Sequence, residues 1–428
     1  MSSESAIPFR ADEAFALQMD VADPLRRYRD FFSLPMLSDG RPRIYFCGNS
    51  LGLQPKSARA AVEQELDAWA RLGVEGHFKR EAPWFSYAED MQGPGTRLVG
   101  GRPGEVVMMN SLTVNLHLLM ATFYRPQPER YKIIVEEPVF PSDLYALQSQ
   151  LRIHGYDFHE GLLWWKPPPG DPCLRMDDLE ELLEREGARV ALVLLGGVNF
   201  LTGQWLDIER VTAAAKRYGC VVGWDLAHAA GNVMLRLHDW QVDFAVWCSY
   251  KYLNSGPGAV ACCFIHETHG RKLDLPRLAG WWGNDPQTRF RMQLQPEFVP
   301  RPGAFGWQVS NPPIFSLAPL RASLALFDEA GMPALRAKSE RLTGYLEFLL
   351  DQIPGSRFEL MTPRDPRQRG CQLSILVRDR PKELLHALEE EGVVCDFREP
   401  NVIRVAPVPL YNMFHEVWNF ARVLELKT

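Results

Sequence analysis

The chain has 428 residues, 46% of them hydrophobic and 23% charged, and its formal net charge is −6 at pH 7. This composition is typical of a globular protein with more than one domain, and the acidic balance argues against a nucleic-acid partner, which would need a clustered basic surface. No apolar run is long enough to span a bilayer, and the first residues lack a basic segment followed by an apolar one, so we expect a cytoplasmic protein without a membrane partner.

Two loops in the first hundred residues are candidate ligand contacts. An apolar run at 44–47 leads into residues 48–52, Gly-Asn-Ser-Leu-Gly. The two glycines would let the backbone approach a ligand closely, or they simply form a connecting turn. Residues 76–85 form an aromatic loop that contains His77, and they are a candidate pocket wall or an ordinary surface loop.

Between these loops the sequence predicts a helix over residues 57–71. Ser57 is a plausible N-cap, and Leu66 and Trp69 belong to one apolar face. Gly73 is expected to end the helix.

Buried apolar runs alternate with helical segments through the middle of the chain. The predicted strands are 106–109, 133–135, 190–195, 221–224, 244–247 and 259–265, and the predicted helices follow residues 110–113 and 140–143 and span 208–217. This alternation predicts an α/β fold with a mostly parallel, doubly wound sheet, in which 259–265 is an antiparallel or edge strand.

The C-terminal part of the chain has a different architecture. A helix is predicted from Met332 to about Ile353, followed by strands near 372–377, 393–397 and 402–406, which is typical of a smaller α+β domain. We therefore predict a large domain of residues 55–310, and a small domain that combines residues 1–54 with 311–428.

Two predicted helix starts suit an anionic ligand. Free backbone N–H groups and the positive end of the helix dipole after Asn110 would face a phosphate, with the Thr113 hydroxyl as a further donor. Read alone, the same residues are only a helix cap. Asp143, at the next helix start, could likewise be a simple cap.

Two buried strands end in residues that carry chemistry. Asp225 ends the strand at 221–224 with His228 three residues on, and Lys251 follows the strand at 244–247. Ligands of open parallel sheets bind at the carboxyl ends of strands. A lysine that forms a Schiff base and an aspartate beside the pyridine nitrogen are the groups that pyridoxal phosphate requires, although both residues could also be solvated loop residues.

Several longer segments of sequence resemble one family. They are Tyr45-Phe46-x-Gly48-Asn49-Ser50-Leu51-Gly52-Leu53, Leu112-Thr113-Val114-Asn115-Leu116-His117, Phe140-Pro141-Ser142-Asp143, Asp225-Leu226-Ala227-His228, Cys248-Ser249-Tyr250-Lys251-Tyr252-Leu253-Asn254 and Arg404-Val405-Ala406-Pro407-Val408-Pro409-Leu410-Tyr411-Asn412. In this order they closely resemble the kynureninases, pyridoxal-phosphate-dependent hydrolases of aminotransferase fold type I. The resemblance covers nearly the whole chain from Ile44 onward.

The resemblance implies a role for each matching residue. Lys251 would hold the cofactor and move the α-proton, Asp225 would pair with the pyridine nitrogen, and Tyr250 is the candidate general acid. The implied cofactor contacts are Leu112, Thr113, Phe140, Asp143, Asp225, His228, Tyr250, Lys251, Trp281 and Asn311, and the implied substrate contacts are Asn49, Ser50, His77, Ser310, Asn311 and Arg404. Trp281 and Asn311 would come from a second subunit, which implies a homodimer. Gly196 stands where some relatives have serine, which leaves a cofactor contact there open.

The implied reaction is hydrolytic Cβ–Cγ cleavage of L-kynurenine or 3-hydroxy-L-kynurenine to the anthranilate and L-alanine, in tryptophan catabolism or the synthesis of NAD precursors. His77, Ser310 and Asn311 would surround the substrate ring. Because a site built to hydrogen-bond a hydroxyl penalises a substrate that lacks it, we expect the 3-hydroxy substrate to be favoured.

Three alternatives remain. A cysteine desulfurase would need a mobile reactive thiol such as Cys371, but desulfurases usually have a histidine where this chain has Tyr250. A catalytically silent scaffold would have no need of the arginine at 404. His266-x-x-His269 could suggest a metal, although surface histidines are the plainer interpretation and we expect no metal. None of the eight cysteines has C-x-x-C spacing, which indicates reduced packing cysteines.

Overall fold

The computed structural model describes residues 8–353 and 358–427. Its central element is a seven-stranded sheet with the order β4-β10-β9-β8-β7-β5-β6. The strands are β4 (Val106–Met108), β5 (Lys132–Glu136), β6 (Leu162–Trp165), β7 (Val190–Gly196), β8 (Val221–Asp225), β9 (Phe244–Cys248) and β10 (Ala261–Ile265). Six of them run in the same direction, and β10 is antiparallel to both of its neighbours. The predicted doubly wound α/β fold is confirmed. Of the two alternatives for residues 259–265, the antiparallel strand is correct, and β10 lies inside the sheet.

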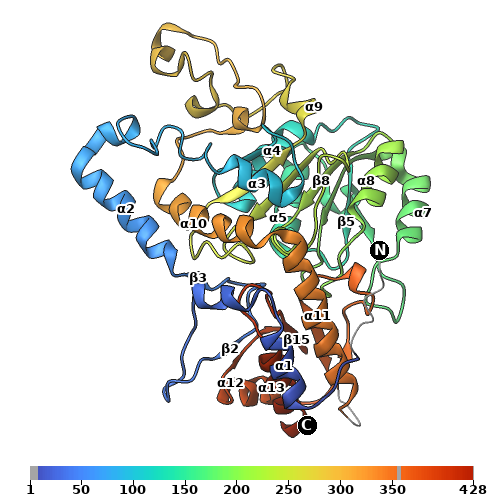
Figure 1. The fold of residues 1–428 in the computed structure, drawn as a ribbon. Coiled ribbons are helices and arrows are strands. Elements are labelled where there is room, and N and C mark those ends of the chain that lie inside the picture. The colour runs from blue at the N-terminus through green and yellow to red at the C-terminus, as the bar shows by residue number, and fades with distance from the viewer. Residues whose placement is uncertain (1–7, 354–357, 428) are drawn as a thin grey trace, which may run out of the picture.

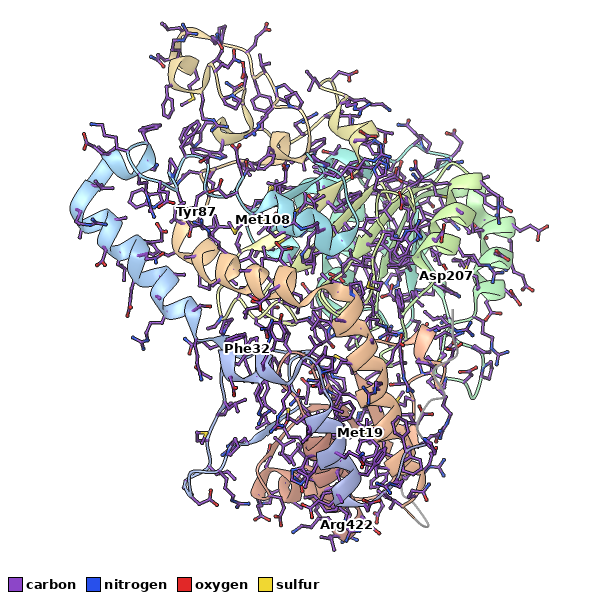
Figure 2. All side chains as sticks on the ribbon, in the orientation of Figure 1. Met19, Phe32, Tyr87, Met108, Asp207 and Arg422 are labelled. Carbon is purple, nitrogen blue, oxygen red and sulfur yellow. The ribbon has the colours of Figure 1, made fainter. Side chains whose placement is uncertain are left out.

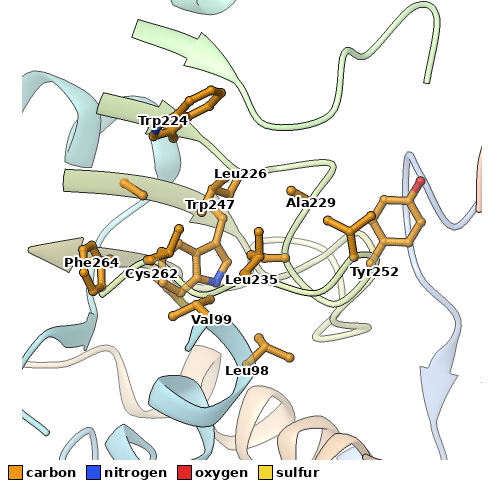
Figure 3. Packing of buried hydrophobic residues seen from close by; sticks show 14 of the residues in the cluster. Leu98, Val99, Trp224, Leu226, Ala229, Leu235, Trp247, Tyr252, Cys262 and Phe264 are labelled. Atoms are coloured by element: carbon orange, nitrogen blue, oxygen red, sulfur yellow. The ribbon is translucent and has the colours of Figure 1, made fainter. Parts of the chain in front are cut away.

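The strands are continuous apolar runs because both faces of the sheet are covered. In β8 and β9, Trp224 and Trp247 belong to one buried cluster, whereas Phe244 and Val246 belong to the cluster on the other face. Figure 3 shows Trp224 and Trp247 on neighbouring strands, with Leu235 close by. Alternate side chains of a strand point to opposite faces, so an apolar residue at every position requires two cores.

Helices on the two faces complete these cores. They include α4 (Leu112–Phe123), α5 (Pro141–Ile153), α7 (Met176–Glu186) and α8 (Ile208–Arg217). Side chains of α4 and α5 lie in the same cluster as Phe244, and those of α7 and α8 lie in the cluster of the two tryptophans. Short connections to these helices bring the carboxyl ends of the strands to one edge.

Helix α2 (Ser57–Leu72) confirms one prediction and corrects one detail of it. Gly73 ends the helix with φ 52°, but Lys56 occupies the N-cap position and Ser57 is the first helical residue. The apolar face to which Leu66 and Trp69 belong is exposed in this chain, since Leu66 is 46% exposed and Trp69 59% exposed. Figure 1 shows α2 at the margin of the molecule, where it packs against α10 (Ile314–Ala330).

The second body is built around an antiparallel sheet of the order β11-β12-β15-β14. Its strands are β11 (Phe358–Leu360), β12 (Leu373–Val377), β14 (Asp396–Arg398) and β15 (Val402–Val405). The strand expected at 393–397 is divided, because β13 (Val393–Val394) pairs with β2 (Ile44–Tyr45) in a separate parallel ladder. This arrangement confirms the predicted smaller α+β unit.

Both ends of the chain contribute to that body. Helix α1 (Glu13–Val21) packs against α13 (Phe414–Lys427), and Asp20 accepts hydrogen bonds from the backbone N–H groups of Phe414 at 2.6 Å and His415 at 3.0 Å. Figure 2 shows Met19 and Arg422 together in this body, while Tyr87 and Met108 lie in the other one. The division into residues 55–310 and 1–54 with 311–428 stays a proposal, and α10 packs into the tryptophan cluster of the large body.

Two long helices were only partly expected. Helix α11 (Met332–Asp351) lies where the sequence predicts a helix, but α10 before it did not stand out because its apolar residues are interrupted by Pro319. Among the described helices, none combines the length and apolar character that crossing a membrane requires.

Candidate active site

A cavity of about 150 Å³ opens at the carboxyl ends of β5, β7 and β8. It is lined by eight residues that the sequence singled out: Leu112, Thr113, Phe140, Asp143, Asp225, His228, Tyr250 and Lys251. These residues come from four separate segments of the chain. The topology of the sheet brings them together, as expected for the ligand site of an open α/β fold.

Lys251 and His228 contact each other in the cavity. The Lys251 Nζ lies 3.1 Å from the His228 Nε2. Burial, followed by the positive charges of Lys251, Arg404 and Arg398, holds the pKa of His228 well below its ordinary value. A neutral imidazole can accept a hydrogen bond from the lysine, so His228 orients the amine without competing for its charge.

Three acidic side chains lie at the base of the cavity. Burial raises the pKa of Asp143 well above its ordinary value, the negative charge of Asp225 adds to this, and the two carboxyl groups share a hydrogen bond. Burial also raises the pKa of Asp225 and brings that of Glu136 to about 7. Like charges in a dry site cannot all ionise, so this cluster retains protons near neutral pH.

Glu136 is a site residue that the sequence analysis missed. Its Oε1 accepts a hydrogen bond from the Gly196 backbone N–H at 3.0 Å, while its Oε2 is buried and has no partner among the described residues. The available signal was its position directly after the buried strand 133–135. At Gly196, a serine Cβ would lie 3.0 Å from the Glu136 Oε1, so glycine leaves room for the acid.

Two helix N-termini face the same cavity. Thr113 lies in the first turn of α4, and Ser142 lies in the first turn of α5, for which Phe140 is the N-cap. The two hydroxyl oxygens are 3.0 Å apart. Asp143 does not cap the helix, and its Oδ1 is buried without a partner in the described part of the chain. Free N–H groups and paired hydroxyls suit a phosphate.

The loop of residues 48–52 lies against the backbone of Lys251. The Gly52 N–H donates to the Tyr250 carbonyl at 2.8 Å, and a Cβ at Gly52 would lie 2.2 Å from the Lys251 carbonyl oxygen. Only glycine fits there. Asn49 is fully buried and donates to the Gln372 Oε1 at 2.9 Å, which ties this loop to the small body.

Phe140 and Phe200 connect the cavity to Arg404. The Lys251 Nζ is 5.6 Å from the centroid of the Phe140 ring, and this ring meets the Phe200 ring edge-on at 5.4 Å. The Arg404 Nη1 donates to the Phe200 carbonyl at 2.6 Å. Phe200, which the sequence analysis also missed, therefore contacts both a predicted cofactor residue and a predicted substrate residue.

The remaining predicted residues lie outside this cavity: Asn49, Ser50, His77, Trp281, Ser310, Asn311 and Arg404. Trp281 and the pair Ser310 and Asn311 lie on adjoining loops, since a Cβ at Gly280 would touch the Val309 carbonyl. Ser310 and Asn311 are exposed, and His77 packs edge-on against Trp84 at 5.4 Å. Within one chain the structure therefore does not bring these four to Lys251.

Comparison with known proteins assigns the chain to a family. A family model described as the kynureninase C-terminal domain matches residues 335–424. Kynureninase from Myxococcus xanthus is 57% identical over 97% of both chains, and kynureninase from Koribacter versatilis is 53% identical over 98% of both. The chain belongs to the kynureninase family. The resemblance drawn from the sequence is thus confirmed.

Solved structures with the same fold include more distant proteins than the kynureninases. The cysteine desulfurase CsdA from Escherichia coli superposes with a TM-score of 0.76 at 18% identity, covering 94% of this chain and 98% of its own. The cysteine desulfurase from Thermococcus onnurineus gives a TM-score of 0.72 at 19% identity, covering 90% and 94%. At such identities the likeness concerns the fold, so kynureninases and desulfurases are distinguished by their side chains.

Cys371 does not have the setting of a reactive desulfurase thiol. Its side chain is fully buried, its backbone N–H is bound by Asn232 at 2.9 Å, and burial raises the pKa of its thiol to about 12. A thiolate nucleophile needs exposure and a lowered pKa.

The two histidines of the His-x-x-His pair serve separate partners. His269 contacts the Asp243 Oδ1 at 2.8 Å, and His266 contacts the His238 carbonyl at 3.3 Å. The surface interpretation is wrong for His266, which is buried. The two side chains therefore do not face one common ligand as a pair.

Proposed function

We propose that this chain is a pyridoxal-phosphate-dependent hydrolase that cleaves the Cβ–Cγ bond of L-kynurenine or its 3-hydroxy derivative, releasing the anthranilate and L-alanine. Membership of the kynureninase family supports this. The observation that carries the proposal is the cavity in which Lys251 contacts His228 beside the paired Asp143 and Asp225. We further propose a cytoplasmic role in tryptophan catabolism or NAD precursor synthesis.

The residues of the cavity fit the proposed cofactor. Asp225 would pair with its pyridine nitrogen, Phe140 would stack on its ring, and Leu112, Thr113 and Tyr250 would hold its phosphate at the N-termini of α4 and α5. The unpartnered buried oxygen of Asp143 supports a further polar ligand group in this place. Bound pyridoxal phosphate supplies an electron sink for the electrons of the bond that breaks.

The protein side chains then account for binding and proton transfer. Lys251 removes the α-proton of the substrate. His228 keeps the amine of Lys251 oriented across the 3.1 Å contact between Nζ and Nε2. Burial raises the pKa of Tyr250, so its hydroxyl keeps its proton and can donate to the substrate carbonyl oxygen. Arg404 would hold the α-carboxylate, for which a planar guanidinium is well suited.

The proposed substrate test follows directly from this reaction. Incubation with 3-hydroxy-L-kynurenine and pyridoxal phosphate is expected to yield 3-hydroxyanthranilate and L-alanine in equal amounts, detected by chromatography. We expect kcat/KM to be about tenfold higher than for L-kynurenine, the value of one well-made hydrogen bond to the ring hydroxyl. A large preference for plain kynurenine would refute the hydroxyl contact. Failure to form either product would refute the function itself.

A homodimer is the proposed assembly, with Trp281 and Asn311 of each chain completing the site of the other. Its support is an exposed apolar surface on α2 and the loops around 278–299. The rings of Trp69 and Phe315 lie 6.1 Å apart there, and the exposed Phe78 and Phe290 contact each other at 5.7 Å. Clustered exposed aromatic residues of this kind mark protein interfaces.

Replacing Trp69 by glutamate is expected to weaken this dimer. Loss of one central aromatic side chain costs about 2 kcal/mol, or about a 30-fold rise in the dissociation constant. Light scattering over a concentration series measures it, and specific activity should fall as monomer appears. Ile153→Glu is the matched control, because Ile153 is 72% exposed at the end of α5 and away from the aromatic cluster. Equal behaviour of the two variants would contradict the proposed interface.

A further inference from the structure

Arg289 is a fully buried arginine outside the cavity of Lys251. It belongs to the segment that follows α9 (Glu267–Gly270), which forms the top of the molecule in Figure 1. Its Nη2 donates to the carbonyl oxygens of Trp282 at 2.6 Å and Asn284 at 3.4 Å. Its Nε and Nη1 have no hydrogen-bond partner among the described residues. The guanidinium is therefore held by backbone carbonyls and by no carboxylate of the described chain.

Two aromatic rings cover the guanidinium. The Arg289 Cζ lies 4.3 Å from the centroid of the Trp282 ring and 5.0 Å from that of the Phe85 ring, and the two centroids are 5.5 Å apart. A cation over an aromatic face is attracted by the quadrupole of the ring. Arg289 thus holds Trp282 by its carbonyl and by its ring, and it joins this segment to the aromatic loop of residues 76–85.

The short turn before Arg289 brings its side chain back onto Trp282. The Thr288 N–H donates to the Asp285 carbonyl at 3.1 Å, and the Asn284 Nδ2 donates to the Thr288 Oγ1 at 3.3 Å. Arg289 begins a 3₁₀ helix directly after this turn. The contact with Trp282 is therefore set by a hydrogen-bonded turn.

The charge of Arg289 has no ionic partner to stabilise it. Burial, with a smaller contribution from the positive charge of Arg301, lowers the pKa of Arg289 to about 10, so the group is charged at neutral pH. Glu89 is the acid that acts on it most, but both carboxylate oxygens of Glu89 are bound by Arg301, at 2.6 and 2.9 Å. An apolar residue in place of such a buried charge is often neutral or stabilising, so stability alone does not account for an arginine here.

The residue next to Trp282 is a predicted cofactor contact. The rings of Trp281 and Trp282 meet edge-on at 4.8 Å. Trp282 is buried, whereas Trp281 is partly exposed and does not line the cavity of Lys251 in its own chain. The position of the Trp281 indole thus depends on Trp282, and that of Trp282 depends on Arg289.

We propose that Arg289 is a positioning residue for the cofactor site of the second subunit: by fixing Trp282, it sets the Trp281 indole for its contact with bound pyridoxal phosphate. This inference rests on the proposed function and on the proposed homodimer. Arg289 itself touches neither cofactor nor substrate, and it acts through the two tryptophans.

The first test measures the affinity of the dimer for pyridoxal phosphate by absorbance titration. Arg289→Met is expected to raise the dissociation constant about tenfold, the value of one hydrogen bond, with kcat at saturating cofactor changed less than about threefold. The Tm of the cofactor-free protein should stay within about 3 °C, because an apolar side chain replaces an unpaired charge. Arg289→Lys keeps a donor for the Trp282 carbonyl and a cation for the two rings, so it should restore most of the affinity.

Two controls separate positioning from a loss of fold or of the dimer. Light scattering at the titration concentration should show intact dimers of every variant. Arg271→Met is the matched control, because Arg271 is exposed near α9 and pairs with Glu267. It should leave the cofactor affinity unchanged. A fall in Tm of more than about 10 °C in Arg289→Met, without restoration of affinity by Arg289→Lys, would mean that the arginine only supports the fold, and it would overturn the inference.

Hybrid dimers show which site Arg289 serves. In the first hybrid, one chain carries Arg289→Met and the other carries Lys251→Ala. In the second, one chain carries both substitutions and its partner is wild type. Each hybrid has a single Lys251, so the concentration of pyridoxal phosphate that gives half-maximal activity reports one site. We expect the wild-type value in the first hybrid and an about tenfold higher value in the second.

Equal values for the two hybrids, or the reverse order, would overturn the inference. Trp281→Phe separates it from the proposed function, because it removes the indole N–H and leaves Arg289 in place. If Trp281→Phe weakens cofactor binding and Arg289→Met does not, only the inference fails. If Trp281→Phe leaves cofactor binding unchanged, the proposed contact of Trp281 is itself wrong.

Discussion

Replacing Lys251 with alanine is expected to lower kcat on L-kynurenine by at least about 10⁴-fold, the upper end of what one positioned proton-transfer group supplies. The effect should be this large because no other described amine is within hydrogen-bond distance of His228. Stopped assays with product chromatography measure it. The fold should persist, since Lys251 lines the cavity and is only partly buried.

Two controls make this result specific. Borohydride reduction should attach the cofactor to the wild-type peptide that contains Lys251 and not to the variant, as mass spectrometry of digests would show. Lys216→Ala is the matched lysine control, because Lys216 lies on α8 outside the cavity and forms an ion pair with Asp243. Activity of the Lys251 variant within tenfold of the wild type would contradict its assigned role.

Replacing Glu136 with glutamine is expected to raise the free energy of unfolding of the cofactor-free protein at pH 8. The increase should be about 3 kcal/mol larger than the effect of the same substitution at pH 4.5. Burial raises the pKa of Glu136 from 4.5 to about 7, and each pKa unit corresponds to about 1.4 kcal/mol. A folded-state pKa above the unfolded value means that the folded protein binds the extra proton. The stability from this group is therefore fully present below pH 4.5 and is lost as pH rises through 7.

The measurement is urea unfolding of wild type and variant at several pH values. The difference between them reports Glu136 together with its electrostatic effect on Asp143 and Asp225, because the groups outside this acidic cluster titrate alike in both proteins. It should grow from near zero at pH 4.5 to its full size above pH 7. Glu63→Gln, at an exposed position on α2, should show no such trend. A difference that does not change with pH would mean that Glu136 ionises normally.

The large sheet and most of the cavity were predictable because their signals are local. A strand buried on both faces is a continuous apolar run, and the residue that ends it lies at the edge where ligands bind. Asp225 and Lys251 could be found in this way, and so could the start of α4, for which a phosphate contact is predicted. Glu136 ends a strand in the same manner, but a single acid there reads equally well as a solvated residue.

Other features depend on contacts between distant segments. The pairing of Arg404 with Phe200 joins residues that are far apart in the sequence, and no local pattern encodes it. The exposure of the apolar face of α2 could not be predicted for a related reason. Periodicity reveals that Leu66 and Trp69 share a face, but it does not reveal whether that face meets the chain's own core or another surface.

The joining of both chain ends in one body has a consequence for biosynthesis. Helix α1 and strand β2 are synthesised long before their partners α13 and β13. The apolar side chains of α1, such as Phe15 and Met19, therefore stay exposed in a partly folded chain while the seven-stranded sheet forms. Nascent chains of this protein are expected to need protection by chaperones until translation ends, and the loss of α13 alone would leave α1 without its main packing partner.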